Sequence, residues 1–153
     1  IWLHPVFDNN KKDNNIVFSW ASEESQAMLE IIQGDIFNKY LGIKIIIHHA
    51  GAMVPFFSSR IAVTMPPQKA EEFKLFYVDT AILGNTLALE MALDYYGEDR
   101  LLFGTDFPFG VMPAGATEEV INSIENMKVS DEVRNKIYRG NMEKLLLNQK
   151  NKL

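Results

Sequence analysis

The chain has 153 residues, of which 47% are hydrophobic and 23% are charged, and its formal net charge is −5. This length and apolar content suit one globular domain with its own core. The acidic balance argues against a nucleic-acid partner, because such binders usually carry a basic patch. No apolar run is long enough to cross a bilayer, so no membrane partner is expected. The lack of cysteine excludes disulfides and thiolate metal sites, and it fits a cytoplasmic location.

The first half of the chain alternates apolar stretches with turn residues. Residues 1–3 predict a short strand that Pro5 ends, and a polar loop follows at 8–15. Residues 23–40 have helical spacing, with a break at Gly34 and an end at Gly42. The β-branched run at 43–47 predicts a strand covered on both faces. A helix is expected at 54–63, and Met65-Pro66-Pro67 is expected to be a loop.

The second half repeats this alternation. Strands are predicted at 75–78 and 100–103, and a helix at 83–96 ends at Gly97. After Pro113 the chain is predicted to be helical, with Thr117 and Ser130 as caps and Asn141 at the start of a last helix. Strands that alternate with helices indicate parallel βαβ units and an α/β fold. The alternation alone does not separate a barrel from an open, doubly wound sheet.

Four polar residues stand at or just after the ends of predicted strands: His4, His49, Asp79 and Asp106. The C-terminal ends of parallel strands share one face, so these side chains are predicted to converge. Imidazole nitrogen and carboxylate oxygen are ligands for Zn²⁺ or Mn²⁺. A metal lowers the pKa of bound water, and a nearby unliganded histidine can move the proton.

Each of these residues also has a structural interpretation. A single strand-end histidine is more often a packing residue than a ligand, and Asp106 before Phe107-Pro108 could be a turn residue. Asp79 is expected to be structural. His48 and His49 should point to opposite faces, so at most one is expected in a pocket. Composition and spacing alone therefore predict an α/β domain with a candidate metal site.

Four sequence motifs carry a more specific resemblance. They are Ile-Trp-Leu-His-Pro at 1–5, Lys-Ile-Ile-Ile-His-His-Ala-Gly-Ala at 44–52, Phe-Tyr-Val-Asp-Thr-Ala at 76–81 and Leu-Leu-Phe-Gly-Thr-Asp-Phe-Pro-Phe at 101–109. In order and spacing the chain resembles the decarboxylase-type amidohydrolases, which include aminocarboxymuconate-semialdehyde decarboxylase and γ-resorcylate decarboxylase. The resemblance implies that residues 1–153 are the C-terminal half of a (β/α)₈ TIM barrel, with about four parallel strands.

The resemblance also implies residue roles. His4 and Asp106 would bind a divalent metal, with zinc expected first and manganese second. His49 would be the acid/base that activates the metal-bound water, and Asp106 would also relay protons. Arg60 matches an arginine that, in some relatives, reaches a substrate carboxylate across a dimer interface, so a homo-oligomer is expected. His48 holds a position that is usually small or apolar in relatives, and it receives no role.

The chain departs from the family pattern at two points. It lacks the His-x-His pair of the first strand, and Ala50-Gly51-Ala52 replaces three glycines, which would tighten the pocket. It also opens on an apolar stretch without an initiator Met, which favours a segment of a longer protein. A half-barrel would expose two sheet edges and an apolar inner face. We therefore expect the N-terminal half of the barrel as a partner, and weak metal binding and no activity without it.

The function expected from these features is a metal-dependent carboxy-lyase or hydrolase that acts on a small carboxylated aromatic or muconate-like substrate. One alternative is a non-catalytic half-barrel that serves as an assembly module. The other is a hydrolase of the same fold that cleaves a lactone or an amide.

Overall fold

A computed structural model describes residues 1–8, 10, 16–110, 113 and 115–150. Its centre is a sheet of four parallel strands in the order β1-β2-β3-β4: β1 (Trp2–Leu3), β2 (Ile46–Ile47), β3 (Tyr77–Asp79) and β4 (Leu101–Leu102). Each strand pairs with the next one along the chain. Consecutive parallel pairing through helical crossovers is the arrangement of a (β/α) barrel segment.

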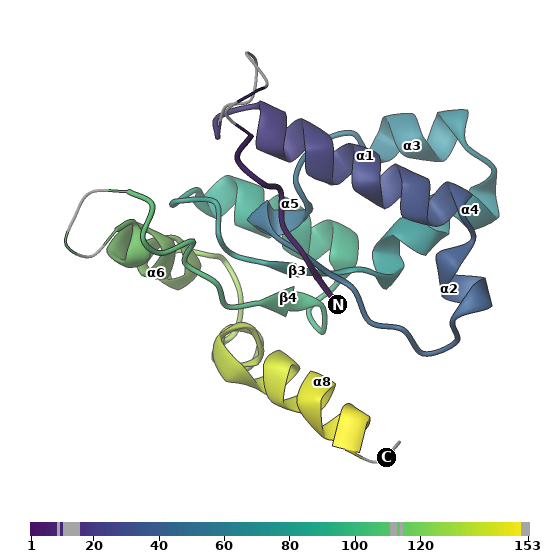
Figure 1. Ribbon diagram of the computed structural model, residues 1–153. Helices are drawn as coiled ribbons and strands as arrows, with labels where there is room; N and C mark the ends of the chain where they lie inside the picture. Colours follow the sequence, from purple (N-terminus) through teal and green to yellow (C-terminus); the bar gives the residue numbers. More distant parts are fainter. Residues whose placement is uncertain (9, 11–15, 111–112, 114, 151–153) are drawn as a thin grey trace.

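Helices fill the crossovers between the strands (Figure 1). The first crossover contains α1 (Ser19–Gln33) and α2 (Ile36–Lys39), and the second contains η1 (His49–Gly51), α3 (Ser58–Thr64), α4 (Pro67–Glu72) and η2 (Phe73–Leu75). The third contains α5 (Thr86–Tyr96). After β4 come α6 (Thr117–Glu125), α7 (Asp131–Asn135), a π-helical turn η3 (Lys136–Gly140) and α8 (Asn141–Lys150). None of the described helices is long and apolar enough to span a bilayer.

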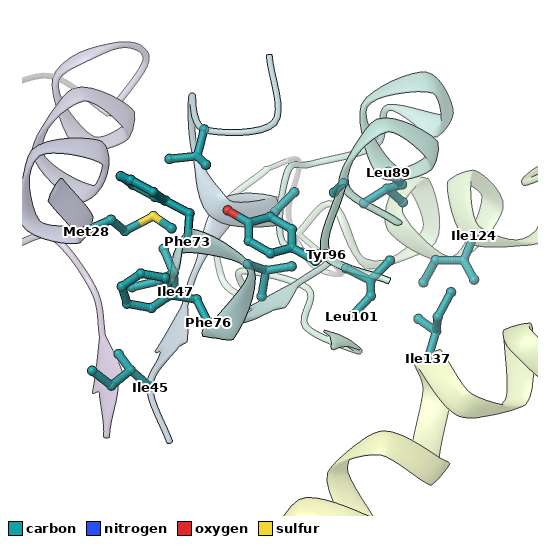
Figure 2. Packing of buried hydrophobic residues seen from close by; sticks show 14 of the residues in the cluster. Met28, Ile45, Ile47, Phe73, Phe76, Leu89, Tyr96, Leu101, Ile124 and Ile137 are labelled. Carbon is teal, nitrogen blue, oxygen red and sulfur yellow. The ribbon is translucent and has the colours of Figure 1, made fainter. Parts of the chain in front are cut away.

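The main core lies between the strands and the helices of the crossovers. Strand residues that alternate in sequence point into it, as the two-residue period of a strand requires. Figure 2 shows these side chains interleaved with those of α1, α5 and α6; the labelled members are Met28, Ile45, Ile47, Phe73, Phe76, Leu89, Tyr96, Leu101, Ile124 and Ile137. This core layer holds the strands in position, and the strands in turn set the positions of the residues at their C-terminal ends.

The opposite face of the sheet is only partly covered. Ile46 and Leu102 form a second cluster with Leu145 of α8, and both strand residues are buried. The expectation of an exposed inner face is therefore wrong at these two positions, because α8 packs against them. At the β1 edge Trp2 is 66% exposed, and among the described strands β1 pairs only with β2 and β4 only with β3. The two expected open edges are present.

Most predicted elements exist, with shifted boundaries. The helix expected at 54–63 begins only at Ser58, because Phe57 before it has a non-helical backbone and is the N-cap residue. The loop predicted at Met65-Pro66-Pro67 ends one residue earlier, because Pro67 is the first residue of α4. Thr117 is the first residue of α6 rather than its cap. Ser130 does cap α7, accepting a hydrogen bond from the Val133 N–H.

Candidate metal and acid–base site

His4 stands directly after β1, where the chain leaves the sheet. Its Nδ1 lies 2.6 Å from the carbonyl oxygen of Pro5. A carbonyl can only accept, so Nδ1 carries the hydrogen and donates it, and Nε2 is left with a free lone pair. Metal-binding histidines are commonly held in this way by a backbone carbonyl on the second nitrogen. The local geometry therefore prepares Nε2 of His4 to act as a ligand.

His49 begins the tight turn η1 that follows β2. Its φ of +54° lies in the left-handed region, as does that of Ala50, at +55°. Such a backbone costs about 1–2 kcal/mol in a non-glycine residue, and residues of this kind are enriched at functional sites. The turn aims the ring across the end of the sheet, where its Nδ1 meets the Glu24 carboxylate of α1 at 2.7 Å. Its Nε2 faces the other way, 3.8 Å from Asp106 Oδ2.

Asp106 lies four residues beyond the end of β4 and also has a positive φ, at +59°. The preceding Gly104 is tied back to β3, because its N–H donates to the Thr80 hydroxyl and its carbonyl accepts from that hydroxyl. A β-carbon at Gly104 would lie only 3.1 Å from Asp79 atoms, so the loop passes β3 at close range. This packing directs the Asp106 carboxylate toward His49.

One potential ligand atom from each of His4, His49 and Asp106 lies within 4.8 Å of the others. Two atoms that share one ion at about 2.2 Å are at most about 4.4 Å apart, so a small closing movement gives metal spacing. The imidazole of His4 and the carboxylate of Asp106 are donors that zinc and manganese accept, and His49 lies beside them. The predicted convergence of these three residues is thus present in the structure, and the donor set fits a divalent cation.

Electrostatics favour a charged His49. Burial lowers the pKa of its imidazole, but the carboxylates of Asp106 and Glu24 outweigh that effect and raise the pKa to about 10. A protonated imidazole between two carboxylates can donate through Nε2 to a group in front of it. A cation bound beside the ring would lower this pKa again, because like charges repel.

The fourth predicted residue, Asp79, has a different partner. Its Oδ2 lies 2.6 Å from Nδ1 of His48, and its Oδ1 accepts a hydrogen bond from the Ala81 N–H. The hydrogen bond with Asp79 is the main cause of a raised pKa for His48. Only one of His48 and His49 was expected to face a pocket, and His48 is the one that forms its hydrogen bond elsewhere, with Asp79. Its ring centre is nevertheless only 4.9 Å from that of His4.

A cavity of about 410 Å³ opens beside His49 and Asp106. Its described lining is otherwise apolar and consists of Ile16, Val17, Trp20, Ala21, Ala52, Ala81, Ile82, Leu83 and Phe109. The Trp20 ring lies nearly parallel to the His49 ring, with centres 6.2 Å apart, and edge-on to Phe109. Flat apolar walls of this kind accept a planar ring, and the polar atoms at one end accept its substituents.

Arg60 does not join this cluster. It is exposed on α3 and lines a different cavity, of about 450 Å³, together with Phe57 and Met53. Its expected contact with a substrate would therefore have to be made in another subunit, and that role stays a prediction.

Sequence reasoning missed two residues of the site, Trp20 and Glu24. Both lie on the buried face of α1, four residues apart, followed on the same face by Met28 and Ile32. The predicted helix began at Glu23, so Trp20 was placed outside it. A glutamate inside an otherwise apolar helical stripe was the available signal for Glu24.

Comparison with known proteins identifies the family. The amidohydrolase family model matches residues 3–147. The chain belongs to the amidohydrolase family. One relative of this amidohydrolase is 6-methylsalicylic acid decarboxylase of Penicillium expansum, which is 28% identical over 92% of this chain and 47% of the relative. Another is γ-resorcylate decarboxylase of a Polaromonas species, which is 30% identical over 83% of this chain and 42% of the relative. The chain spans less than half the length of these two relatives.

Solved structures agree with the fold. A dihydroxybenzoic acid decarboxylase from Polaromonas, solved with manganese and 2-nitroresorcinol, matches 94% of the chain and 48% of its own chain, with a TM-score of 0.78 and 27% identity. The decarboxylase branch and the half-length TIM-barrel architecture expected from the sequence are both confirmed.

Proposed function

We propose that this amidohydrolase segment belongs to a metal-dependent decarboxylase of small aromatic carboxylic acids. The observation that carries the proposal is the meeting of His4, His49 and Asp106 at the mouth of an apolar cavity. The named activities of the relatives support decarboxylation over hydrolysis, because the matched proteins are decarboxylases of 6-methylsalicylic and γ-resorcylic acids. The relatives' full length implies that a second set of strands completes the barrel.

In this proposal His4 and Asp106 hold a divalent cation and His49 is the acid/base. The cation, when bound, would neutralise negative charge on the substrate's carboxylate and phenolic oxygens. Zinc was the first expectation from sequence, but the manganese in the Polaromonas structure makes manganese the first metal to test. The aromatic ring would lie against Trp20 and Phe109, and the carboxylate would face His49.

The chemistry assigned to His49 is a proton transfer from Nε2 to a ring carbon. The proton is added to the carbon that bears the carboxylate, the carbon–carbon bond breaks, and its electron pair restores the aromatic ring as CO₂ departs. His49 then regains a proton from solvent. General acid–base groups of this type contribute about 10²–10⁴-fold to the rate. Arg60 is kept as a group that would reach a neighbouring subunit's substrate in a homo-oligomer.

The test is a decarboxylation assay on the full-length protein after metal removal and after reloading with manganese or zinc. Salicylates and dihydroxybenzoates would be offered, and CO₂ release would be followed. We expect metal-dependent release from at least one of these acids. Metal-independent turnover, or hydrolysis of lactones or amides without any decarboxylation, would contradict the proposal.

An assembly module is the second candidate, and one observation favours it. Trp2 at the β1 edge is two-thirds exposed, so the segment presents an apolar edge to a partner. A full-length protein that assembles but shows no decarboxylation or hydrolysis with any metal would support this alternative.

A further inference from the structure

We propose that Glu24 is a positioning residue, which fixes the orientation of the His49 ring so that Nε2 faces the cavity. The inference rests on the proposed acid/base role of His49 and adds a residue of α1 to the site. Glu24 Oε2 lies 2.7 Å from His49 Nδ1, and the glutamate side chain is only 1% exposed. The contact joins residues that are 25 positions apart, on different elements.

The place of Glu24 on its helix argues against a role in packing. The buried face of α1 contains Trp20, Glu24, Met28 and Ile32, at the i, i+4 spacing of one helix face. An ionised carboxylate in such an apolar stripe costs free energy unless it is paired, and an apolar residue of similar size would pack at no such cost. Among the described residues, the hydrogen bond of this side chain goes to His49, and that contact accounts for the presence of a carboxylate here.

The second carboxylate oxygen strengthens this argument. Glu24 Oε1 is buried and has no hydrogen-bond partner among the described residues. A carboxylate that serves the fold normally uses both oxygens, as Asp79 does with His48 and the Ala81 N–H. Glu24 instead directs one oxygen at His49 and leaves the other unmatched. Buried polar atoms usually have a hydrogen-bond partner, so the single contact with His49 sets Glu24 apart from Asp79.

The surroundings hold the pair in place. On one side the Trp20 ring stacks near His49, with centres 6.2 Å apart. On the other, the Tyr96 phenol lies so close under the turn that a β-carbon at Gly51 would be 2.3 Å from the phenol oxygen. Trp20 of α1 and Tyr96 of α5 therefore pack beside the turn that carries His49. In this low-dielectric setting a single charge-assisted hydrogen bond has a large orienting effect.

The contact with Glu24 decides which nitrogen of His49 faces the cavity. A carboxylate accepts, so Nδ1 must carry hydrogen, and Nε2 is the nitrogen that points toward Asp106 and the cavity. Carboxylate-oriented histidines act in this way in many enzymes, where the carboxylate fixes the tautomer and the ring angle. Loss of the carboxylate would remove the acceptor that holds Nδ1–H toward α1, and with it the contact that keeps Nε2 toward the cavity.

The decisive variant is Glu24→Gln in the full-length, metal-loaded enzyme, with Glu30→Gln as its control. Glu30 lies on the exposed face of the same helix, so the control makes the same change of charge away from the site. We expect Glu24→Gln to lower kcat by about 10–100-fold with little change in KM, metal content or thermal midpoint. Glu30→Gln should leave all four values unchanged. Glu24→Asp restores the charge at a longer distance and should regain part of kcat.

Nitrogen NMR of labelled histidine gives a readout that a merely structural role would not change. In the parent protein the His49 signals, assigned with His49→Ala, should show a strongly hydrogen-bonded Nδ1–H, and in Glu24→Gln this hydrogen-bond signature should be weakened or lost. A normal kcat for Glu24→Gln, beside a large loss in His49→Ala, would overturn the positioning role alone. A normal kcat for His49→Ala would overturn the proposed function instead. If Glu24→Gln unfolds and Glu24→Asp retains full kcat, the role is structural and the proposal fails.

Discussion

His48 and His49 are neighbours in the chain, and each has Nδ1 held by a buried carboxylate, at 2.6 and 2.7 Å. The resemblance ends there. Asp79 is satisfied at both oxygens and lies on the adjacent strand, whereas Glu24 comes from α1 and has an unmatched oxygen. His49 also lines the apolar cavity, and His48 does not. The same pair of residue types is thus fully hydrogen-bonded away from the cavity in one place and lies at the cavity wall in the other.

The largest expected difference between the two pairs is in turnover. In the full-length enzyme His49→Ala should lower kcat by about 10²–10⁴-fold, because the acid/base is removed. His48→Ala should lower it by less than about tenfold, because His48 pairs with Asp79 and does not line the cavity. Steady-state kinetics of the two variants at equal metal loading would measure this. Equal losses would show that both histidines act on the substrate.

The next effect concerns stability and pH. The hydrogen bond with Asp79 raises the pKa of His48 in the folded protein. The pair therefore stabilises the fold most at a pH below about 6.5, the pKa of histidine in the unfolded chain, where His48 is protonated in both the folded and the unfolded state. That contribution is lost as the pH rises through the raised pKa. Asp79→Asn should therefore destabilise the protein by about 1–3 kcal/mol at about pH 5.5 and by less at about pH 9.5. Urea unfolding at the two pH values measures this, and an equal loss at both would contradict it.

A smaller effect is expected at the turn after His49. Ala52 lines the cavity and has a φ of +55°, a conformation that glycine adopts without strain. Ala52→Gly should therefore stabilise the protein or leave it unchanged, by up to about 1–2 kcal/mol. It should also lower KM for acids with bulkier ring substituents, because one methyl group leaves the wall. A lower melting temperature together with an unchanged substrate range would refute this.

The sequence predicted the part of the site that follows strand ends. His4, His49 and Asp106 could be placed because parallel strands end at one face and because the motifs resemble a known family. Glu24 and Trp20 could not be placed in the site from the sequence. Their positions depend on the rotation of α1 about its axis relative to the sheet, and core packing sets that rotation. The closeness of the His48 and His4 rings was not predicted either, because four non-glycine residues with positive φ lie in and around the site, at His49, Ala50, Ala52 and Asp106. Such backbone is stabilised by tertiary contacts and leaves little signal in the sequence.

The predicted ends of helices were wrong for a related reason. The start of α5 was expected at Leu83, but the Asn85 side chain accepts a hydrogen bond from the Ala88 N–H and sets the start at Thr86. Leu83 itself has a φ of +57° and cannot continue a helix. Periodicity locates a helix, whereas caps and turns fix its ends.

The central claim is that His4 and Asp106 hold one divalent cation beside His49. Elemental analysis of the full-length protein tests it directly, with His4→Ala and Asp106→Ala compared with His48→Ala as the matched control. We predict about one ion per chain in the parent and in His48→Ala, and a loss of most of it in the other two variants. Parent-level metal in both His4→Ala and Asp106→Ala would contradict the account.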